Sequence, residues 1–310
     1  MQTVFRLAHL TDPHVGPLPR PQLRQLLNKR LTGWFNWHRS RQGNHDMELL
    51  AELVADLHAQ QPDHIACTGD VANIGLPEEW PTARVFMDGL GSPDDVSFVP
   101  GNHDAYVPGS LEGLLGEIGP FTRGDDGAEQ SFPFVRRRGP VTLVGLSSAI
   151  PTLPFVATGR LGRRQCEEAE QILRDLARDC DCFRIVLIHH PPHVGGAKEG
   201  RNLTDAPRFE ALIRRVGAEL VLHGHNHVGS LASLKGPRGP VPVVGAPSAS
   251  ARGGTLSHKA GYHLFTVGRD ETGFVLKAEL RGLTPEGRVG GLGMLSLSRI
   301  SSPDQTTLGV

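Results

Sequence analysis

The stretch Val96-Ser97-Phe98-Val99-Pro100-Gly101-Asn102-His103-Asp104 decides the fold. Its first four residues are β-branched or aromatic apart from one serine, which is typical of a short buried strand, and the Pro-Gly pair predicts the turn that ends it. The turn then presents an amide, an imidazole and a carboxylate in succession. Polar groups at the end of a core strand gain nothing from burial unless they bind something. The stretch therefore predicts a buried strand that delivers functional side chains to one end of a sheet.

Polar side chains also follow four other strand-like runs of the chain. Asp12 and His14 follow 4–10, Asp70 follows 64–68, His189 and His190 follow 183–188, and His225 and His227 follow 219–222. Helical patterns separate several of these runs; in residues 47–59, leucine and valine recur at helical spacing. Alternating strands and helices predict parallel strands with helices outside. Because the carboxyl ends of parallel strands meet at one edge, we expect these side chains to meet there.

This set of side chains is suited to binding metal ions. Seven of them are candidate ligands: Asp12, His14, Asp70, Asn102, His189, His225 and His227. Two divalent cations about 3.5–4 Å apart can hold a phosphoester and a hydroxide, and they need carboxylate oxygens, imidazoles and usually one bridging ligand. Asp70 is the natural bridge, because its carboxylate has two oxygens and it follows a central strand. A set of mixed oxygen and nitrogen ligands can bind Mn, Fe, Zn or Co, and it does not indicate which of these metals is bound.

Two neighbours of Asn102 are candidates for catalysis. His103 is expected to point away from the metals, which suits a group that donates a proton to the leaving oxygen or stabilises its charge. Asp104 is expected to orient His103 as its hydrogen-bond partner.

The five motifs, taken in order, resemble those of the calcineurin-like metallophosphoesterase family. They are Asp12-x-His14, Gly69-Asp70, Gly101-Asn102-His103-Asp104, His189-His190-Pro191 and Gly224-His225-x-His227, and they span residues 12–227. Each motif alone is common, whereas five in order, each after a strand, are specific. The double histidine before Pro191-Pro192 is similar to the family's bacterial phosphodiesterase branch, which acts on cyclic nucleotides and glycerophosphodiesters.

The resemblance implies a fold and a set of roles. The fold is an α/β four-layer α-β-β-α sandwich of two mixed β-sheets flanked by helices. The first metal would be held by Asp12, His14, Asp70 and His227, and the second by Asp70, Asn102, His189 and His225. His103 would take the role of the family's catalytic histidine, and His190, next to the ligand His189, would lie in the substrate pocket.

The function that this resemblance implies is metal-dependent phosphoester hydrolysis, with a small phosphodiester as the expected substrate. A hydroxide between two divalent metal ions would attack phosphorus in line while His103 assists departure of the alkoxide. The alternative without catalysis is a metal-binding or partner-binding scaffold that kept the fold. Such a scaffold should have lost a ligand or the catalytic histidine, and the sequence contains all of them.

Residues 17–45 form an insertion of basic and aromatic character. It carries two of the three tryptophans, several arginines and no acid between Asp12 and Asp46, and Leu23, Leu27 and Leu31 recur at helical spacing. One interpretation is a helical segment packed over the domain with solvated cations. The other is a surface that contacts a membrane or a lipid-linked substrate, as in family members that cleave the pyrophosphate of UDP-diacylglucosamine.

Composition limits the other classes of function. The net charge of the 310 residues is −1, so there is no basic footprint for nucleic acid and no specific nucleic-acid partner is expected. There is no apolar run of about 18 residues and no basic leader before the first strand, so we expect a cytoplasmic protein, with peripheral membrane contact as the alternative. All four cysteines are expected to be reduced thiols.

One catalytic domain is expected over residues 1–282, followed by a loose tail over 283–310 in which glycine, serine and proline increase. The runs 131–135 and 141–146 predict a hairpin with three arginines, 136–138, at its solvated tip. Short strands after residue 240 are expected to form a second, more antiparallel sheet. The oligomeric state does not follow from the sequence.

Overall fold

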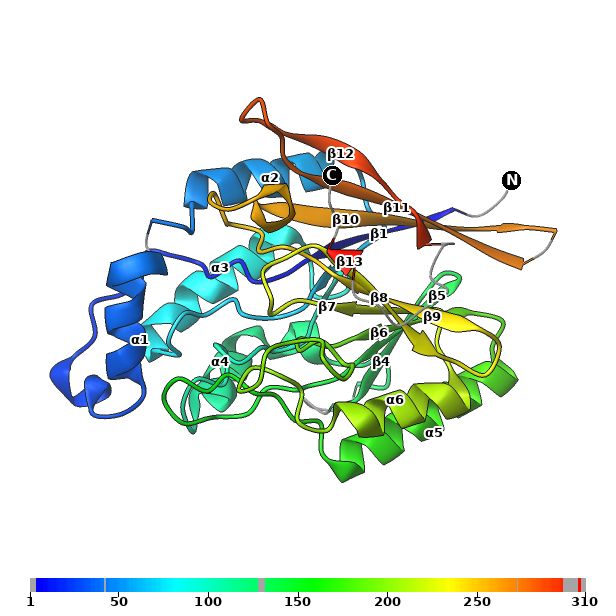
Figure 1. The fold of residues 1–310 in the computed structure, drawn as a ribbon, viewed down its shortest axis with the longest axis horizontal. Helices are drawn as coiled ribbons and strands as arrows, with labels where there is room; N and C mark the ends of the chain where they lie inside the picture. The colour runs from blue at the N-terminus through cyan, green and yellow to red at the C-terminus, as the bar shows by residue number, and fades with distance from the viewer. Residues whose placement is uncertain (1–3, 42, 128–131, 272, 298–305, 308–310) are drawn as a thin grey trace.

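Two mixed β-sheets form the centre of the molecule (Figure 1). The structure is a computed structural model that describes residues 4–41, 43–127, 132–271, 273–297 and 306–307. In the first sheet, β1 (Phe5–Leu10), β2 (His64–Cys67) and β3 (Val96–Phe98) are parallel neighbours. On the other side of β1 this sheet continues with antiparallel strands, which are β10 (Gly261–Asp270), β11 (Gly273–Leu283) and β12 (Val289–Leu295).

The second sheet has a parallel centre and antiparallel edges. Its strand order is β13-β8-β9-β7-β6-β5-β4, in which β5, β6, β7 and β9 are parallel. The strands are β4 (Phe134–Arg138), β5 (Val141–Gly145), β6 (Phe183–Leu187), β7 (Leu220–His223), β8 (Ser230–Lys235), β9 (Pro240–Gly245) and β13 (Thr306–Thr307). The antiparallel strands after residue 260 therefore extend the first sheet, and the expectation that they form the second sheet is wrong.

Helices cover the outer faces of both sheets. In Figure 1, α2 lies above the first sheet, whereas α5 and α6 lie below the second. The helices are α1 (Arg30–Asn36), α2 (Met47–Ala59), α3 (Trp80–Leu90), α4 (Ser110–Ile118), α5 (Arg163–Asp179) and α6 (Ala206–Val216), with short helical turns η1 (Leu23–Leu26), η2 (Trp37–Arg41), η3 (Pro77–Glu79), η4 (Gly119–Thr122) and η5 (Leu256–His258). This arrangement confirms the predicted α-β-β-α sandwich.

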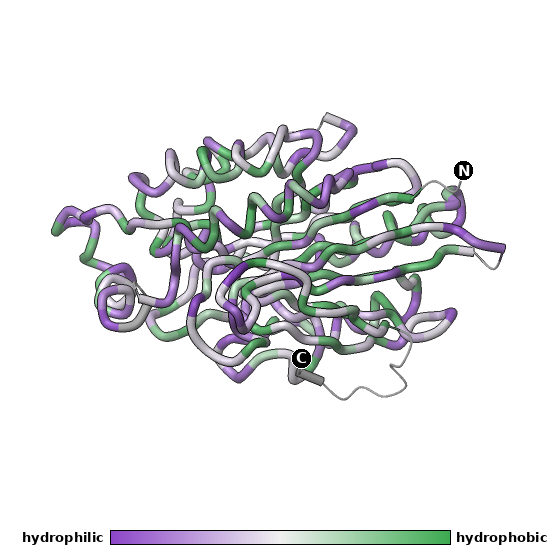
Figure 2. Tube along the Cα trace, turned by 90° about the horizontal axis from the view of Figure 1, so that it is seen from above, coloured by the Kyte–Doolittle hydropathy of each residue, from purple (hydrophilic) through white to green (hydrophobic). Residues whose placement is uncertain are grey.

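Three buried apolar clusters hold the four layers together. Leu53 of α2 packs in one cluster with Phe98 of the first sheet, and Leu173 of α5 in another with Val186 of the second sheet. A third cluster lies between the sheets and contains residues of both, such as Leu7. In Figure 2 hydrophobic stretches recur along the strands in the middle of the molecule. Burial of apolar surface on both faces explains why these strands read as continuous apolar runs rather than as alternating ones.

The parallel strands deliver their carboxyl ends to one side of the molecule. β1 runs from the N-terminal side in Figure 1 toward the side on which α1 lies, and β2, β3, β6 and β7 end at the same edge. This common direction follows from the right-handed crossovers that helices impose between parallel strands. All five sequence motifs therefore reach one region.

The insertion 17–45 differs from the helix that its leucine spacing predicts. Its regular parts are η1, α1 and η2, with irregular chain between the first two. Leu23 and Leu27 are each 86% exposed, so they do not pack over the domain. The aromatic Trp37 is buried instead. No helix in the described ranges combines the length and hydropathy needed to cross a membrane.

The expected tail from residue 283 onward is partly ordered within the sheets. β12 pairs antiparallel with β11 over Ala278–Leu283, and β13 pairs with β8. The boundary between domain and tail at residue 282 is therefore wrong, because the segment 289–295 completes an edge of the first sheet.

Arg136 was expected at a solvated hairpin tip, but it is buried. Its guanidinium donates to four backbone carbonyl oxygens, those of Pro93 (2.5 Å), Val96 (2.6 Å), Arg123 (2.7 Å) and Pro120 (2.9 Å). Burial lowers its pKa to about 10, which leaves it charged near neutral pH. One side chain thus satisfies carbonyls from three segments around β3.

Replacing Arg136 with alanine should destabilise the fold by about 2–4 kcal/mol, because four buried carbonyls would lose their donor. Urea denaturation followed by circular dichroism measures this loss. Arg137→Ala is the matched control, since the neighbouring Arg137 side chain is exposed. Equal midpoints for the two variants would contradict the structural role given to Arg136.

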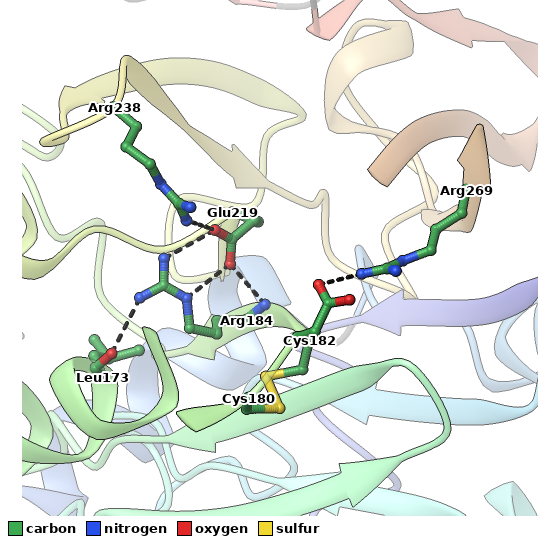
Figure 3. Close-up of a disulfide and its surroundings, with 8 residues drawn as sticks. Leu173, Cys180, Cys182, Arg184, Glu219, Arg238 and Arg269 are labelled. Carbon is green, nitrogen blue, oxygen red and sulfur yellow. Dashed lines mark hydrogen bonds and ion pairs between the residues drawn. A yellow bond between two sulfur atoms is a disulfide. The ribbon is translucent and has the colours of Figure 1, made fainter. Parts of the chain in front are cut away.

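The cysteines depart from the expectation of four reduced thiols. Cys180 and Cys182, between α5 and β6, form a disulfide (Figure 3). Cys67 and Cys166 are free and buried. The Cα atoms of the bonded pair are 5.3 Å apart, within the usual reach of a disulfide. A spacing of one residue between two cysteines does not exclude pairing between their thiols. Burial raises the pKa of Cys166 to about 11, so this thiol stays protonated.

Candidate metal centre

Asp12 follows β1 and is fully buried. Its Oδ2 atom accepts hydrogen bonds from the Thr11 hydroxyl (2.7 Å) and from the backbone N–H of His225 (2.9 Å). Its Oδ1 atom faces the Nε2 atom of His227 at 3.1 Å. The carboxylate is therefore held through one oxygen and presents the other to imidazole.

His14 and His227 present ring nitrogens to one another. His14 donates from Nδ1 to the carbonyl oxygen of Ala72 (3.2 Å), which leaves its Nε2 lone pair 3.2 Å from the Nε2 atom of His227. Together with two carboxylates, these histidines offer ligand atoms within 4.8 Å of one another; the group is Asp12, His14, Asp70 and His227. It is the set that the family resemblance implies for the first metal.

Asp70 lies between this group and a second one. Its Oδ1 atom accepts from the backbone N–H of His103 (2.7 Å). Its Oδ2 atom lies 3.9 Å from Nε2 of His14 and 3.4 Å from Nε2 of His189. A single oxygen that faces both histidines is placed where a bridging ligand is needed.

The second group consists of His189, Asn102 and His225. His189 donates from Nδ1 to the carbonyl oxygen of Thr68 (2.7 Å), so that its Nε2 lone pair faces the Oδ1 atom of Asn102 at 3.3 Å. His225 Nδ1 lies 2.8 Å from the same Asn102 oxygen. The structure therefore brings all seven candidate ligands together.

The chemistry of these donors fits divalent cations. Two backbone carbonyls take the Nδ1 protons of His14 and His189, an arrangement typical of metal-binding histidines because it fixes the tautomer and directs Nε2 toward the metal. In the neutral rings that bind metal, the Nε2 lone pairs then face lone pairs of the neighbouring ligand atoms and are repelled by them. A cation would turn this repulsion into coordination, and the mixed oxygen and nitrogen set admits Mn, Fe, Zn or Co.

The backbone at this site is strained in a consistent way. Seven non-glycine residues among those described have positive φ, and five of them are candidate ligands: Asp12 (51°), His14 (42°), Asp70 (57°), His225 (72°) and His227 (55°). Such conformations cost of order 1–3 kcal/mol each and persist where the surroundings impose them. Gly224 contributes to the close fit, because a Cβ atom there would collide with Thr11 and Asp12. The turns are thus shaped for the ligands rather than for their own stability.

The charges of the two buried aspartates follow from their neighbours. Burial acts to raise the pKa of Asp12, but the facing His227 and the bond from Thr11 outweigh it and hold that pKa well below its usual range. For Asp70 burial is likewise outweighed, mainly by His189, and its pKa is lowered. Both carboxylates are therefore ionised at neutral pH, as metal ligands must be.

His103 lies beside the metal ligands. Its Nδ1 atom makes a hydrogen bond with the carbonyl oxygen of Asn73, and its ring stacks on Tyr106 with centroids 5.4 Å apart. The ring of His14 meets it edge-on at 4.8 Å. His103 also lines a pocket of about 200 Å³ together with Asp70, Asn102 and His227, so its ring reaches the space over the candidate metals.

Asp104 has a different role from the expected one. Its Oδ2 atom accepts from the backbone N–H groups of Asp70 and Gly101 (both 2.8 Å), and Oδ1 accepts from Ala72 (3.0 Å). Burial and the charge of Asp70 raise its pKa to about 7, and the three backbone donors favour its ionised form. Asp104 therefore joins the turns that carry Asp70 and Asn102. The hydrogen-bond partner of His103, predicted to be Asp104, is the carbonyl of Asn73 instead.

His190 also differs from its expected role in the substrate pocket. It is fully buried, with Nδ1 2.7 Å from the Ser148 hydroxyl and Nε2 3.2 Å from the carbonyl oxygen of Ala157. Burial lowers its pKa to about 3, so the ring is neutral. Its ring packs 4.4 Å from that of His225. His190 thus supports a ligand and the loop around Ala157.

His45 lies just before α2. Asp46 caps α2, since its Oδ1 atom accepts from the backbone N–H groups of Glu48 (2.9 Å) and Leu49 (3.0 Å). His45 nevertheless lines the same pocket as the metal ligands. The triplet Asn44-His45-Asp46 has the same sequence as Asn102-His103-Asp104, and this repetition is the feature of the sequence that could have indicated a role for His45 at the site. Tyr106 had no signal of its own.

Removing metal with EDTA should lower the melting temperature by about 5–10 °C, because cations that bind only the folded state stabilise it by mass action. Differential scanning calorimetry before and after chelation measures the effect, and added Mn²⁺ should reverse it. The Asp70→Ala variant is the control and should show a much smaller change. A wild-type melting temperature that chelation leaves unaltered would contradict the metal centre.

Comparison with known proteins agrees with this geometry. The calcineurin-like phosphoesterase family model matches residues 5–229. The chain is 33% identical over 234 residues to the glycerophosphodiester phosphodiesterase GpdQ of Enterobacter lignolyticus. The aligned region covers 71% of this chain and 70% of that protein. The chain is 27% identical over 201 residues to a probable cyclic nucleotide phosphodiesterase of Synechococcus sp., covering 64% and 69% of the two chains.

Solved structures share the fold at lower identity. The purple acid phosphatase PPD1 of yellow lupin seeds has a TM-score of 0.56 at 14% identity and covers 94% of this chain, which spans 53% of that enzyme. A dimetal phosphatase from Danio rerio has a TM-score of 0.54 at 13% identity, covering 88% of this chain and 98% of its own. The stretch matched by the family model contains every candidate ligand. The chain therefore belongs to the calcineurin-like phosphoesterase family and is a phosphoester hydrolase.

Proposed function

We propose that the protein hydrolyses a small phosphodiester at a dinuclear metal centre. The observation that carries this proposal is the position of Asp70, whose Oδ2 atom faces His14 on one side and His189 on the other. A ligand shared in this way supports two adjacent cations, an arrangement that stabilises both the attacking and the leaving oxygens of an in-line displacement. The names of the two phosphodiesterase relatives support a diester rather than a monoester substrate.

Two divalent cations held by these ligands would supply Lewis-acid polarisation of the phosphoryl group and activation of a water molecule. The chain's own contribution begins with His103, whose ring reaches the pocket above the ligands. Because Nδ1 donates to the Asn73 carbonyl, the proton for the leaving alkoxide comes from Nε2 of the doubly protonated ring, which becomes neutral in that step. Stacking on Tyr106 keeps the ring in this orientation.

A neighbouring pocket of about 280 Å³ is suited to the organic part of a diester. Asn102 and His103 form the side toward the metal centre, and the aromatic rings of Tyr106 and Phe155 also line it. Arg201 lines both this pocket and the one over the metals, so its cation can offset phosphate charge. This volume accommodates a glycerol or a nucleoside group, in line with the substrates in the names of the two relatives.

The test is a substrate panel with purified, metal-loaded protein. Bis-p-nitrophenyl phosphate should be hydrolysed with added Mn²⁺, and cyclic nucleotides and glycerophosphodiesters should then identify the natural class. p-Nitrophenyl phosphate, a monoester, is the matched comparison and should react more slowly. Absence of turnover with every divalent metal, in protein that remains folded, would favour the scaffold alternative.

A second candidate is hydrolysis of a lipid-linked phosphoester or pyrophosphate of the UDP-diacylglucosamine type at a membrane surface. The observation that favours it is the distribution of exposed large apolar side chains. Ten occur among the described residues, and six fall in two segments, 23–35 and 153–155: Leu23, Leu27, Leu31, Phe35, Leu153 and Phe155. Lys29 connects the segments by donating to Thr152 Oγ1 (2.6 Å) and to the Val156 carbonyl (2.9 Å). Apolar side chains among exposed arginines can bind an anionic bilayer peripherally.

Sedimentation with phosphatidylglycerol vesicles tests this second candidate. Wild-type protein should pellet with the vesicles, and the double variant Leu27→Glu/Phe35→Glu should remain in the supernatant. Val85→Glu is the control, because Val85 is 71% exposed on α3 and lies outside the two segments. No pelleting of the wild type, together with hydrolysis of water-soluble diesters, would leave the first proposal as the function.

A further inference from the structure

His45 is brought to the metal centre by contacts that span the chain. Its backbone forms a bridge with Ala251, and the backbone N–H of Asp46 donates to the Ser250 carbonyl (2.9 Å). Asp46 also pairs with Arg252 at 2.6 Å. The His45 ring lies parallel to that of Trp37, with centroids 6.0 Å apart. The insertion is thus fastened on both sides of His45, which fixes the place of this side chain.

The ring of His45 lies over the first group of ligands. Its centroid is 4.7 Å from that of His14 and 5.9 Å from that of His227. A nitrogen of His45 lies within 4.8 Å of ligand atoms of these two imidazoles. A second set within the same distance consists of the two imidazoles and the carboxylates of Asp12 and Asp70, and His45 is not part of it. Ligands of one cation are at most about 4.4 Å apart when each bond is about 2.2 Å. Since His45 does not group with Asp12 and Asp70, we assign the carboxylate-bearing set to the cation and treat His45 as its neighbour.

Two serines lie beside the Nδ1 atom of His45 and bear on which ring nitrogen carries the proton. Ser248 donates its hydroxyl to the carbonyl oxygen of Asp12 (2.7 Å) and lies 3.4 Å from Ser250 Oγ. Ser250 Oγ lies 2.7 Å from Nδ1 of His45, which is the shorter contact. With the Ser250 hydroxyl donating to Nδ1, the neutral ring carries its proton on Nε2 and is a hydrogen-bond donor on that side.

We propose that His45 is a further substrate-binding residue, whose Nε2–H donates to a non-bridging oxygen of the phosphoryl group. The proposal rests on the proposed function, because it assigns this side chain to the phosphate that the metal centre would hold. The ring lines the pocket together with Asp70, Asn102 and His103, so a phosphoryl group there lies within the same pocket as both His103 and His45. A charge-assisted bond of this kind is stronger than a neutral one and is directional. The insertion 17–45 thereby supplies one residue of the catalytic pocket.

The experiment compares metal-loaded wild type with His45→Ala, His45→Gln and His58→Ala. His58 is an exposed histidine of α2 that donates to the Gly89 carbonyl outside the site, and it serves as the control. Calorimetric titration with inorganic phosphate gives a Kd, elemental analysis gives the metal content, and bis-p-nitrophenyl phosphate gives kcat and KM. His45→Ala should keep two metals per chain and weaken phosphate binding roughly tenfold or more, with a similar rise in KM. His45→Gln, which keeps a donor, should recover part of the affinity.

Two results would overturn the proposal. Loss of metal from His45→Ala would make this residue a ligand, and a phosphate Kd equal to that of His58→Ala would remove it from the site. Failure of the proposed function would look different, because the wild type itself would then hydrolyse none of the diesters. The phosphate titration would still decide the role of His45 in that case.

Discussion

Replacing Asp70 with alanine is expected to remove metal and activity together. Its Oδ2 atom faces ligands of both groups, so its loss leaves each cation with one ligand fewer and takes away the link between them. Metal catalysis contributes several kcal/mol of transition-state stabilisation, so turnover should fall on the order of 10³-fold or more. Elemental analysis after gel filtration gives the metal content, and hydrolysis of bis-p-nitrophenyl phosphate gives the rate.

Asp88→Ala is the control for this experiment. Asp88 is an exposed carboxylate of α3 that pairs with Arg84 at 2.7 Å, so its removal changes the net charge equally and leaves the site intact. Both metals should remain and activity should be unaffected in that variant. An Asp70→Ala protein that retains two metals per chain would disprove the bridging assignment.

Replacing His103 with alanine should have the opposite pattern, with both metals retained and turnover reduced. The bond that holds Asp70 comes from the backbone N–H of His103, so it survives removal of the ring. General acid catalysis contributes typically 10²- to 10⁴-fold, and kcat should fall by about that factor. The loss should be larger for a glycerophosphodiester than for bis-p-nitrophenyl phosphate, because an alkoxide needs a proton on leaving more than a nitrophenolate does.

The comparison between the two substrates separates the roles open to His103. Equal losses would mean that the ring stabilises charge without donating a proton. Loss of metal would mean that it is a ligand. His64→Gln is a suitable control, since His64 is a buried histidine of β2 whose ring bonds to Ser97 (2.8 Å) and not to the site.

The meeting of the candidate ligands could be predicted because their positions follow from local rules. A strand that ends in a turn needs only a few consecutive residues, and Asp12, Asp70 and Asn102 each come directly after such a run. Parallel strands with helical crossovers then bring the turns together without any knowledge of individual contacts. The sandwich was predictable for the same reason, together with the family resemblance.

Other residues could not be assigned from sequence, because their partners are remote along the chain. Asp104 bonds to backbone groups 32 and 34 residues away, and a carboxylate next to His103 gives no sign of that. The ring of His190 meets Ser148 across 42 residues. From their neighbours in the sequence, Asp104 was expected to orient His103 and His190 to line the substrate pocket. In the structure Asp104 binds backbone N–H groups, and the His190 ring packs against the candidate ligand His225.

The insertion shows how spacing can mislead when packing decides. Leu23 and Leu27 have the period of a buried helix face, yet both are exposed, while Trp37 and Lys29 are buried. Burial lowers the pKa of Lys29 to about 8, and its ammonium lies 4.6 Å from the centre of the Tyr106 ring. Leucine periodicity predicts a buried helix face only when another part of the protein packs against that face. Here the domain packs against Lys29 and Trp37 instead of against the leucines.

The sequence by itself determined which atoms could bind metal and at which edge of the sheets they would meet, because strand ends and ligand types are local properties. Tertiary structure alone decided what surrounds them. The hydrogen bond between His45 and Ser250 joins residues 205 positions apart, and such a contact exists only after the two sheets have packed. A candidate metal ligand and a residue that positions it can be of the same type. The hydrogen bonds that each makes with distant backbone and side chains distinguish the two roles.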